Sequence, residues 1–145
     1  MVRGEFDAPR ATRTLHPFDE PRIAVCSEHS DLTRFEHLDC ADVQHWPLVV
    51  NTVSGTTGPW SWPAEQRPER IIETANYDEW LESVAANRGI GIVPEFARRR
   101  TRHPAVRFVP LTHAPPSPVS LVYLPDGQRT LGRRFLDAAV EAAAR

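Results

Sequence analysis

Two short cysteine and histidine pairs are the first candidates for chemistry in this sequence. Cys26 and His29 are separated by two residues, as are His37 and Cys40, and His45 follows. These residue types and short spacings are typical of zinc ligands. Against a metal site, Cys26 ends an apolar segment, and the turn that carries His29 does not direct it toward Cys40. We favour buried thiols and surface imidazoles, and keep a small zinc-binding enzyme as an alternative.

A loop rich in hydroxyls is the second candidate. Residues 51–58 read Asn-Thr-Val-Ser-Gly-Thr-Thr-Gly and directly follow an apolar segment. In open α/β sheets, ligands bind at the carboxyl ends of strands. Hydroxyl and backbone N–H groups can hold a carboxylate or another anion, and glycine lets the backbone approach closely. An ordinary Ser/Thr turn explains the composition equally well. Ser54 is not expected to be a nucleophile, because it lacks both glycines of the G-x-S-x-G elbow.

Arginine and tryptophan side chains supply weaker signals. Residues 98–102 form the basic run Arg-Arg-Arg-Thr-Arg. We interpret this run as a solvated face, because no recognisable nucleic-acid-binding motif accompanies it. Trp80 is expected in the core, whereas Trp60 and Trp62 could face a ligand.

Composition narrows the class of protein. The chain has 145 residues, of which 41% are hydrophobic and 25% charged, as expected for one globular domain. Its 17 basic residues are all arginines, which excludes every mechanism that needs a lysine. With a net charge of -2, the protein as a whole is not attracted electrostatically to nucleic acid or to anionic membranes. Because we find neither a membrane-spanning run nor a secretion signal, we expect a cytoplasmic protein with reduced cysteines.

The elements that must position these residues follow from hydrophobic patterning. Short apolar segments bounded by turn residues predict strands. These segments cover residues 1–3, 22–26, 48–51, 71–74, 90–93, 107–111 and 119–124. Residues 4–21 are expected to form an extended connection, residues 37–44 a short helix, residues 59–68 no long helix, and residues 128–144 a C-terminal helix. Alternating strands and helices predict an α/β domain with an at least partly parallel sheet.

The clearest predicted helix covers residues 77–88. Its apolar residues recur at the spacing of one buried face: Tyr77, Trp80, Leu81, Val84 and Ala85. Asn76 can cap this helix, with Glu79 completing a capping box. Gly89 follows the last turn and is expected to close the helix in the left-handed conformation.

The segment from Tyr77 to Pro94 closely resembles the most characteristic segment of the LysR-type transcriptional regulators. In that family, a helix ending in V-A-x-G-x-G-I-x-x-x-P belongs to the effector-binding domain. Weaker similarities to the family follow the same order along the chain, in residues 23–29, 38–51, 108–111 and 121–123. The resemblance therefore extends from about residue 2 to the C-terminus.

The resemblance implies a fold and a division of the chain. The expected fold is a periplasmic-binding-protein-like (type II) regulatory lobe, with a mixed, largely parallel sheet flanked by helices. Residues 1–20 would form a crossover strand and connection, residues 21–125 the second effector-binding lobe, and residues 126–145 a helix that returns to the first lobe in the family. Without that lobe, the helix would either pack elsewhere or expose Leu131 and Phe135, and the exposed patch would favour self-association as a homo-oligomer.

The resemblance also implies a function without catalysis, metal or cofactor. A small molecule, often an organic acid in this family, would bind in the cleft and change the domain's conformation. The matching residues here are Asn51, Thr52, Ser54, Gly55, Thr56, Thr57, Asn76 and Tyr77. DNA would be bound only through a helix-turn-helix domain that has no counterpart in this chain. We therefore expect an expressed piece, a mis-started reading frame or a naturally truncated relative. A solute-binding lobe of a transport protein, similar in fold, is the second alternative.

Overall fold

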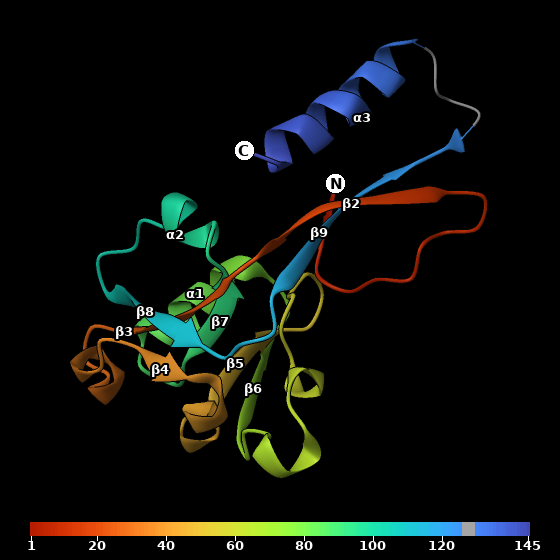
Figure 1. The fold of residues 1–145 in the computed structure, drawn as a ribbon. Helices are drawn as coiled ribbons and strands as arrows, with labels where there is room; N and C mark the ends of the chain where they lie inside the picture. The colour runs from red at the N-terminus through yellow and green to blue at the C-terminus, as the bar shows by residue number, and fades with distance from the viewer. Residues whose placement is uncertain (126–129) are drawn as a thin grey trace. The chain divides into compact units, whose positions relative to one another are not determined.

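The computed structural model describes residues 1–125 and 130–145, which form two compact units. One unit contains residues 1–20 and 117–145, and the other contains residues 21–116 (Figure 1). Within the described residues, no helix is both long enough and apolar enough to span a membrane.

The first unit is a three-stranded antiparallel sheet with one helix. Strand β9 (Ser117–Tyr123) lies between β1 (Val2–Arg3) and β2 (Arg13–Glu20). The expected extended connection is therefore wrong for its second half, which is strand β2. Pro17 obscured this strand because proline cannot donate a ladder hydrogen bond. The structure accommodates it at a register shift between Leu15 and Phe18.

Helix α3 (Thr130–Ala143) ends the first unit. Its predicted first residue, Gln128, lies outside the described residues. Leu131 is 78% exposed and Phe135 is 63% exposed, so of the two expected alternatives the structure shows the exposed apolar face.

The second unit contains a mixed sheet in the order β4-β8-β3-β7. These strands are β3 (Arg22–Ser27), β4 (Leu38–Asp39), β7 (Gly91–Pro94) and β8 (Val106–Thr112). Strand β3 is antiparallel to both of its neighbours, whereas β4 is parallel to β8. The α/β fold with a mixed sheet is confirmed, but the expectation of a largely parallel sheet is wrong. One reason is that β3 carries the chain into this unit and β8 carries it out, so these two strands run in opposite directions.

A second, parallel pair of strands carries the candidate loop. Strand β5 (Leu48–Asn51) pairs with β6 (Ile71–Thr74), and a single parallel bridge joins Leu48 to Ile90. The predictions of these two strands are confirmed.

The helix predicted over residues 37–44 is corrected by the structure. Residues 38–39 are strand β4, and a 3-10 helix, η2 (Cys40–His45), follows. The Asp39 carboxylate accepts a hydrogen bond from the Ala41 amide at 2.9 Å, which fixes the start of η2. Pro47 limits its end, since the residue before a proline disfavours helical backbone angles.

The remaining short helices lie in connections of the second unit. They are η1 (Asp31–Arg34), η3 (Pro59–Ser61), η4 (Ala64–Gln66) and α2 (Ala97–Arg100). The proline-rich residues 59–68 therefore contain the single turns η3 and η4 and no long helix, as predicted.

Helix α1 (Tyr77–Ala85) is the predicted amphipathic helix. The Asn76 side chain accepts a hydrogen bond from the Glu79 amide at 2.9 Å, so the predicted cap is confirmed. The Glu79 carboxylate accepts from the Ala75 amide at 3.0 Å, one residue earlier than a standard capping box. The expectation for the other end is wrong: α1 stops at Ala85, and Asn87, with φ 57°, takes the left-handed conformation expected of Gly89. Asparagine tolerates this conformation better than most residues.

Gly89 and Gly91 are needed for close packing. A Cβ atom on Gly89 would lie 2.5 Å from the Pro47 carbonyl oxygen, and one on Gly91 would lie 2.0 Å from the Trp80 ring. The two glycines therefore let the chain after α1 pass directly against β5 and under Trp80.

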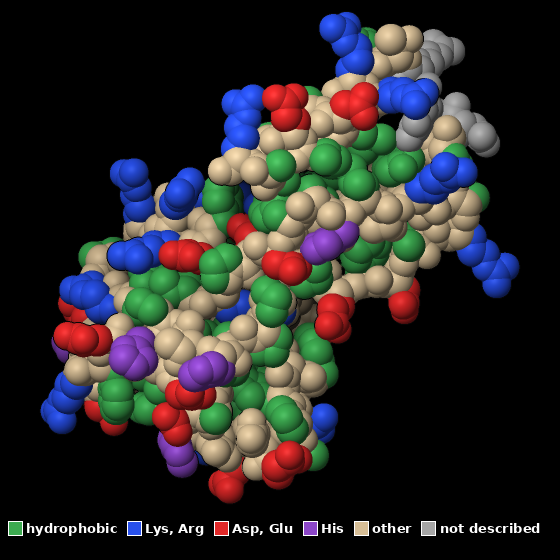
Figure 2. Space-filling view, in the orientation of Figure 1, with side chains coloured by type: hydrophobic (Ala, Val, Ile, Leu, Met, Phe, Trp, Pro, Cys, Tyr) green, Lys and Arg blue, Asp and Glu red, His purple; other side chains and the backbone are tan. Residues whose placement is uncertain are grey.

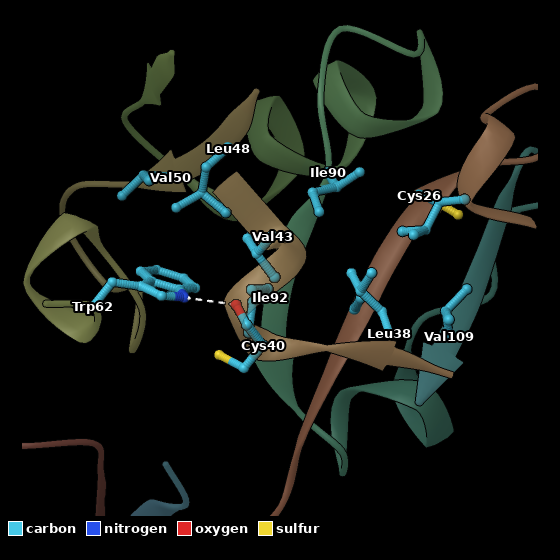
Figure 3. Packing of buried hydrophobic residues seen from close by; sticks show 12 residues of the cluster. Cys26, Leu38, Cys40, Val43, Leu48, Val50, Trp62, Ile90, Ile92 and Val109 are labelled. Carbon is cyan, nitrogen blue, oxygen red and sulfur yellow. Dashed lines mark hydrogen bonds between the residues drawn. The ribbon is translucent and has the colours of Figure 1, made fainter. Parts of the chain in front are cut away.

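Two buried clusters cover the two faces of β3. Ala24 and Cys26 point into one cluster, and Val25 points into the other with Trp80. Trp80 is 4% exposed, which confirms its predicted core position. Trp62 is also 4% exposed and donates its indole N–H to the Cys40 carbonyl at 3.1 Å, as the dashed line in Figure 3 shows. The expectation that Trp62 could face a ligand is therefore wrong.

Candidate functional site

The hydroxyl-rich loop and the start of α1 lie at one end of the β5–β6 pair. The two strands are parallel and in register, with Asn51 opposite Thr74. Both backbone and side chain of Thr52 donate to the Thr74 carbonyl, at 3.0 and 3.2 Å. The Thr74 hydroxyl donates back to the Val50 carbonyl at 3.1 Å. Residues 52–57 and residues 75–77 therefore leave the sheet side by side.

The side chain of Asn51 holds the start of the loop through hydrogen bonds to residues 53 and 54. Its side-chain oxygen accepts hydrogen bonds from the Val53 and Ser54 amides, both at 3.1 Å. Its side-chain N–H donates to the Ser54 hydroxyl at 2.9 Å. Gly55 donates its amide to the Asn51 carbonyl at 3.0 Å, where a Cβ atom would collide with that oxygen. Asn51 is buried, so its role here is to shape the turn.

Arg22 anchors the far end of the loop. Its Nη1 atom donates to the Thr56 carbonyl at 2.7 Å and to the Thr57 hydroxyl at 2.5 Å. Its Nε atom donates to the Pro115 carbonyl at 2.8 Å. Arg22 was not among the predicted site residues, and its only signal in the sequence is its place at the start of a buried strand. The structure thus places a permanent positive charge beside the loop.

The exposed polar groups of the loop are fewer than its composition suggests. Thr57 is buried, and the Thr52 hydroxyl is bonded to Thr74. Ser54 is exposed, and its hydroxyl keeps a donor hydrogen because it accepts from Asn51. Thr56 is half-buried and uses only its carbonyl toward Arg22. Ser54 and Thr56 are therefore the predicted residues best able to contact a ligand.

Asn76 and Tyr77 border the same edge but are engaged within the protein. The Asn76 side-chain oxygen caps α1, as described above. The Tyr77 hydroxyl shares a hydrogen bond with Thr101, and its ring stacks on Trp80 with centroids 5.4 Å apart. The carboxylates of Asp78 and Glu79 in the first turn offset the positive end of the helix dipole. An anion is therefore held better on the Arg22 side of the loop than on the helix side.

The cysteines and histidines do not assemble into a cluster. Cys26 and Cys40 are buried at separate places in the core (Figure 3), whereas His29 and His45 have exposed rings. Burial raises the pKa of the Cys26 thiol from 9.0 to about 11 and also raises that of Cys40. Residues 1–125 and 130–145 contain no group of three His, Cys, Asp or Glu residues that could hold a metal.

The arginine run and Trp60 lie on the surface. Arg98, Arg99 and Arg100 are exposed on α2. Acidic and basic side chains both occur across the face of the molecule in Figure 2, in keeping with the small net charge. Trp60 is 62% exposed, and its ring takes the space where a Cβ atom on Gly58 would lie.

Comparison with known proteins identifies the family. Residues 1–144 match the family model described as the LysR substrate binding domain. No curated protein matches the chain in sequence.

Solved structures show the same fold at low sequence identity. The BenM effector-binding domain with its effector benzoate superposes with a TM-score of 0.80 at 15% identity, over 98% of this chain and 68% of that one. The effector-binding domain of QuiR in complex with shikimate superposes with a TM-score of 0.73 at 13% identity, over 97% of this chain and 69% of that one. Full-length CbnR in complex with its target DNA superposes with a TM-score of 0.78 at 15% identity, over 97% of this chain and 51% of that one. The chain thus spans about two thirds of the isolated domains and about half of the full-length regulator.

Proposed function

The chain belongs to the LysR substrate-binding domain family, and from this premise we propose that it binds a small organic anion at the loop after β5. The ligand contacts the exposed hydroxyls of Ser54 and Thr56, beside the guanidinium of Arg22. The remaining predicted site residues, Asn51, Thr52, Gly55, Thr57, Asn76 and Tyr77, shape and border this site. The protein binds the ligand without transforming it.

The observation that carries this proposal is the position of Arg22 against residues 56–57. A carboxylate next to a guanidinium and hydroxyl donors makes charge-assisted hydrogen bonds, which are about twice as strong as neutral ones. The relatives named above hold benzoate and shikimate, each of which carries a carboxylate. An anionic effector therefore suits the permanent positive charge of Arg22, which contacts this loop.

The same arginine supplies a route for a conformational signal. Arg22 directly follows Pro21, and it also binds the carbonyl of Pro115. The chain passes between its two units at residues 20–21 and 116–117, next in sequence to Arg22 and Pro115. A ligand that draws Arg22 toward itself changes its hydrogen bond to Pro115. We propose that ligand binding in this way controls a regulator whose DNA-binding part is a separate domain, acting as a homo-oligomer.

The test is a nuclear magnetic resonance titration of the 145-residue chain. Benzoate and shikimate serve as probes, up to about 10 mM to detect affinities in the millimolar range. The expected result is a saturable shift of the amides of residues 52–57 and of the Arg22 side-chain N–H. The double substitution Ser54→Ala and Thr56→Ala should weaken binding roughly tenfold.

A matched pair of hydroxyl deletions provides the control. Thr14→Ala and Thr130→Ala remove two hydroxyls from exposed residues of the other unit, and this variant should bind as the unmodified chain does. If neither probe shifts the loop, or if both double variants bind equally well, the loop is not the site for these carboxylates.

A further inference from the structure

A pocket lies at the opposite end of the β5–β6 pair from the candidate loop. Its lining includes Pro47 and Arg70, which directly precede β5 and β6, and Asn87 and Arg88, which follow α1. The cavity has a volume of about 670 Å³. Drug-sized ligands occupy pockets of roughly 300–1,000 Å³. We propose that this distal pocket binds a small organic anion that has an apolar body and a carboxylate or phosphate group.

Two guanidinium groups give the pocket its positive character. Within residues 1–125 and 130–145, the side chains of Arg70 and Arg88 have no hydrogen-bond or ion-pair partner. Asp31 supplies the pocket's one carboxylate, and its Oδ1 atom already accepts a hydrogen bond from the Trp46 indole at 2.9 Å. The lining of the pocket therefore carries two permanent positive charges and one carboxylate, which is already hydrogen-bonded to Trp46. Guanidinium groups bind carboxylates and phosphates in a bidentate geometry.

The dipole of α1 explains neither of these arginines. Arg88 lies beyond Ala85, where α1 ends, and the last turn of the helix holds no basic residue. Arg70 precedes a strand and gains nothing from that dipole. Its backbone carbonyl accepts from the Leu48 amide at 2.9 Å, so the Arg70 backbone is fixed where the β5–β6 pair begins.

The apolar part of the pocket is prearranged. Trp46, Ile72 and Ile90 contribute the apolar side chains. Phe35 and His45 pack edge-on against the Trp46 ring, with centroids 6.0 and 6.3 Å away. Together with the bond to Asp31, these contacts hold the indole in one orientation before any ligand arrives. A rigid aromatic wall lowers the conformational entropy lost on binding.

The close passage of Gly89 across Pro47 builds the floor of the pocket. Both residues line the cavity, and the Gly89 backbone is too near the Pro47 carbonyl for any side chain. The Ile90 amide donates to the same carbonyl at 2.8 Å. The floor is thus held by backbone contacts and does not need a ligand to form.

The experiment follows the indole N–H resonance of Trp46, assigned with Trp46→Phe, in the full chain. The probes are phenyl phosphate, phthalate and inorganic phosphate, each added to about 10 mM. We expect phenyl phosphate or phthalate to shift Trp46 and the amides of residues 87–90 in a saturable way. Inorganic phosphate, which lacks an apolar body, should bind at least about tenfold more weakly.

A charge-matched control separates a site from general anion attraction. Arg70→Gln and Arg88→Gln together should weaken binding at least about tenfold, since each removes charged hydrogen-bond donors. Arg98→Gln and Arg99→Gln remove the same charge from α2 and should leave the affinity unchanged. The proposal is overturned if no organic probe shifts Trp46, if both double variants lose binding equally, or if inorganic phosphate binds as well as the organic anions.

This outcome is independent of the proposed effector loop, because the two sites are read from different resonances. Shifts confined to residues 52–57 would support the loop and contradict the distal pocket, whereas shifts confined to Trp46 and residues 87–90 would do the reverse.

Discussion

The Nη1 atom of Arg22 lies 2.5 Å from the Thr57 hydroxyl and donates a hydrogen bond to it. The contact joins the first residue of β3 to a loop 35 residues later in the chain. It therefore connects an inner strand of the mixed sheet with the candidate ligand site.

Replacing Arg22 should loosen this loop. Arg22→Gln removes donors to the carbonyls of Thr56 and Pro115 and to the Thr57 hydroxyl, and we expect a loss of about 2 kcal/mol in the free energy of unfolding. Urea denaturation followed by tryptophan fluorescence measures this loss, and hydrogen exchange should accelerate at Thr57 and Gly58. Arg145→Gln, which breaks an exposed pair with Glu141, should cost close to nothing. Equal effects of the two substitutions would contradict the anchoring role.

Gly89 should not tolerate a side chain. Gly89→Ala places a methyl group against the backbone of Pro47, which cannot rotate away, so we expect a destabilisation of at least about 2 kcal/mol. Chemical denaturation measures it. Gly132→Ala inside the exposed face of α3 is the matched control and should be neutral or stabilising, because alanine favours helix over glycine. A mild effect at Gly89 would show that β5 can move away from the chain after α1.

Gly91 and Trp80 should be energetically coupled. The obstacle to a Cβ atom at Gly91 is the Trp80 ring, so Gly91→Ala should be much less harmful once Trp80→Leu has removed that ring. A double-mutant cycle should give a coupling of about 1 kcal/mol or more. Additive effects would mean that the strain at Gly91 comes from some other neighbour.

The Cys26 thiol should make the protein sensitive to alkali. Burial raises its pKa in the folded state to about 11, against 9.0 when exposed. The folded form therefore holds its proton where the unfolded form has lost it, and stability falls as the pH rises from about 9 to about 11. The loss should reach about 1–3 kcal/mol. Cys26→Ala should reduce this alkaline decline when unfolding free energies are compared across that range, and an unchanged decline would assign it to other groups.

Asp39 should titrate below its usual range. The Ala41 amide, and next the His113 side chain at 2.7 Å, hold the pKa of this carboxyl below 3.8. Its contribution to stability is present above pH 3.8 and disappears as the pH falls through the lowered pKa. In a carbon-detected titration, His113→Gln should raise the Asp39 pKa only part of the way, because the Ala41 bond remains. A full return to 3.8 would make His113 the larger cause.

Elements with strong local signals could be predicted from the sequence. Helix α1 has a complete apolar face and a capping residue, and β5 and β6 are short apolar runs between turns. These features depend on neighbouring residues, so one sequence is enough to find them.

Features that depend on distant contacts could not be predicted. Trp62 lies in a proline-rich segment, and only its hydrogen bond to Cys40, 22 residues away, shows that it is buried. Arg22 likewise gains its role from partners 34 and more residues later. The wrong prediction at Gly89 has a local cause. Asn87 occupies the position of the first glycine in the family motif, and it is Asn87 that takes the left-handed backbone conformation expected of Gly89.

The indole of Trp80, seated in the space that a side chain at Gly91 would fill, interlocks α1 with β7. Sliding of α1 along β7 is opposed, because it would move the ring from Gly91 toward the side chain of Val93, which packs against the same cluster. A ligand that pulls on the start of α1 therefore has to move helix and strand as a single block.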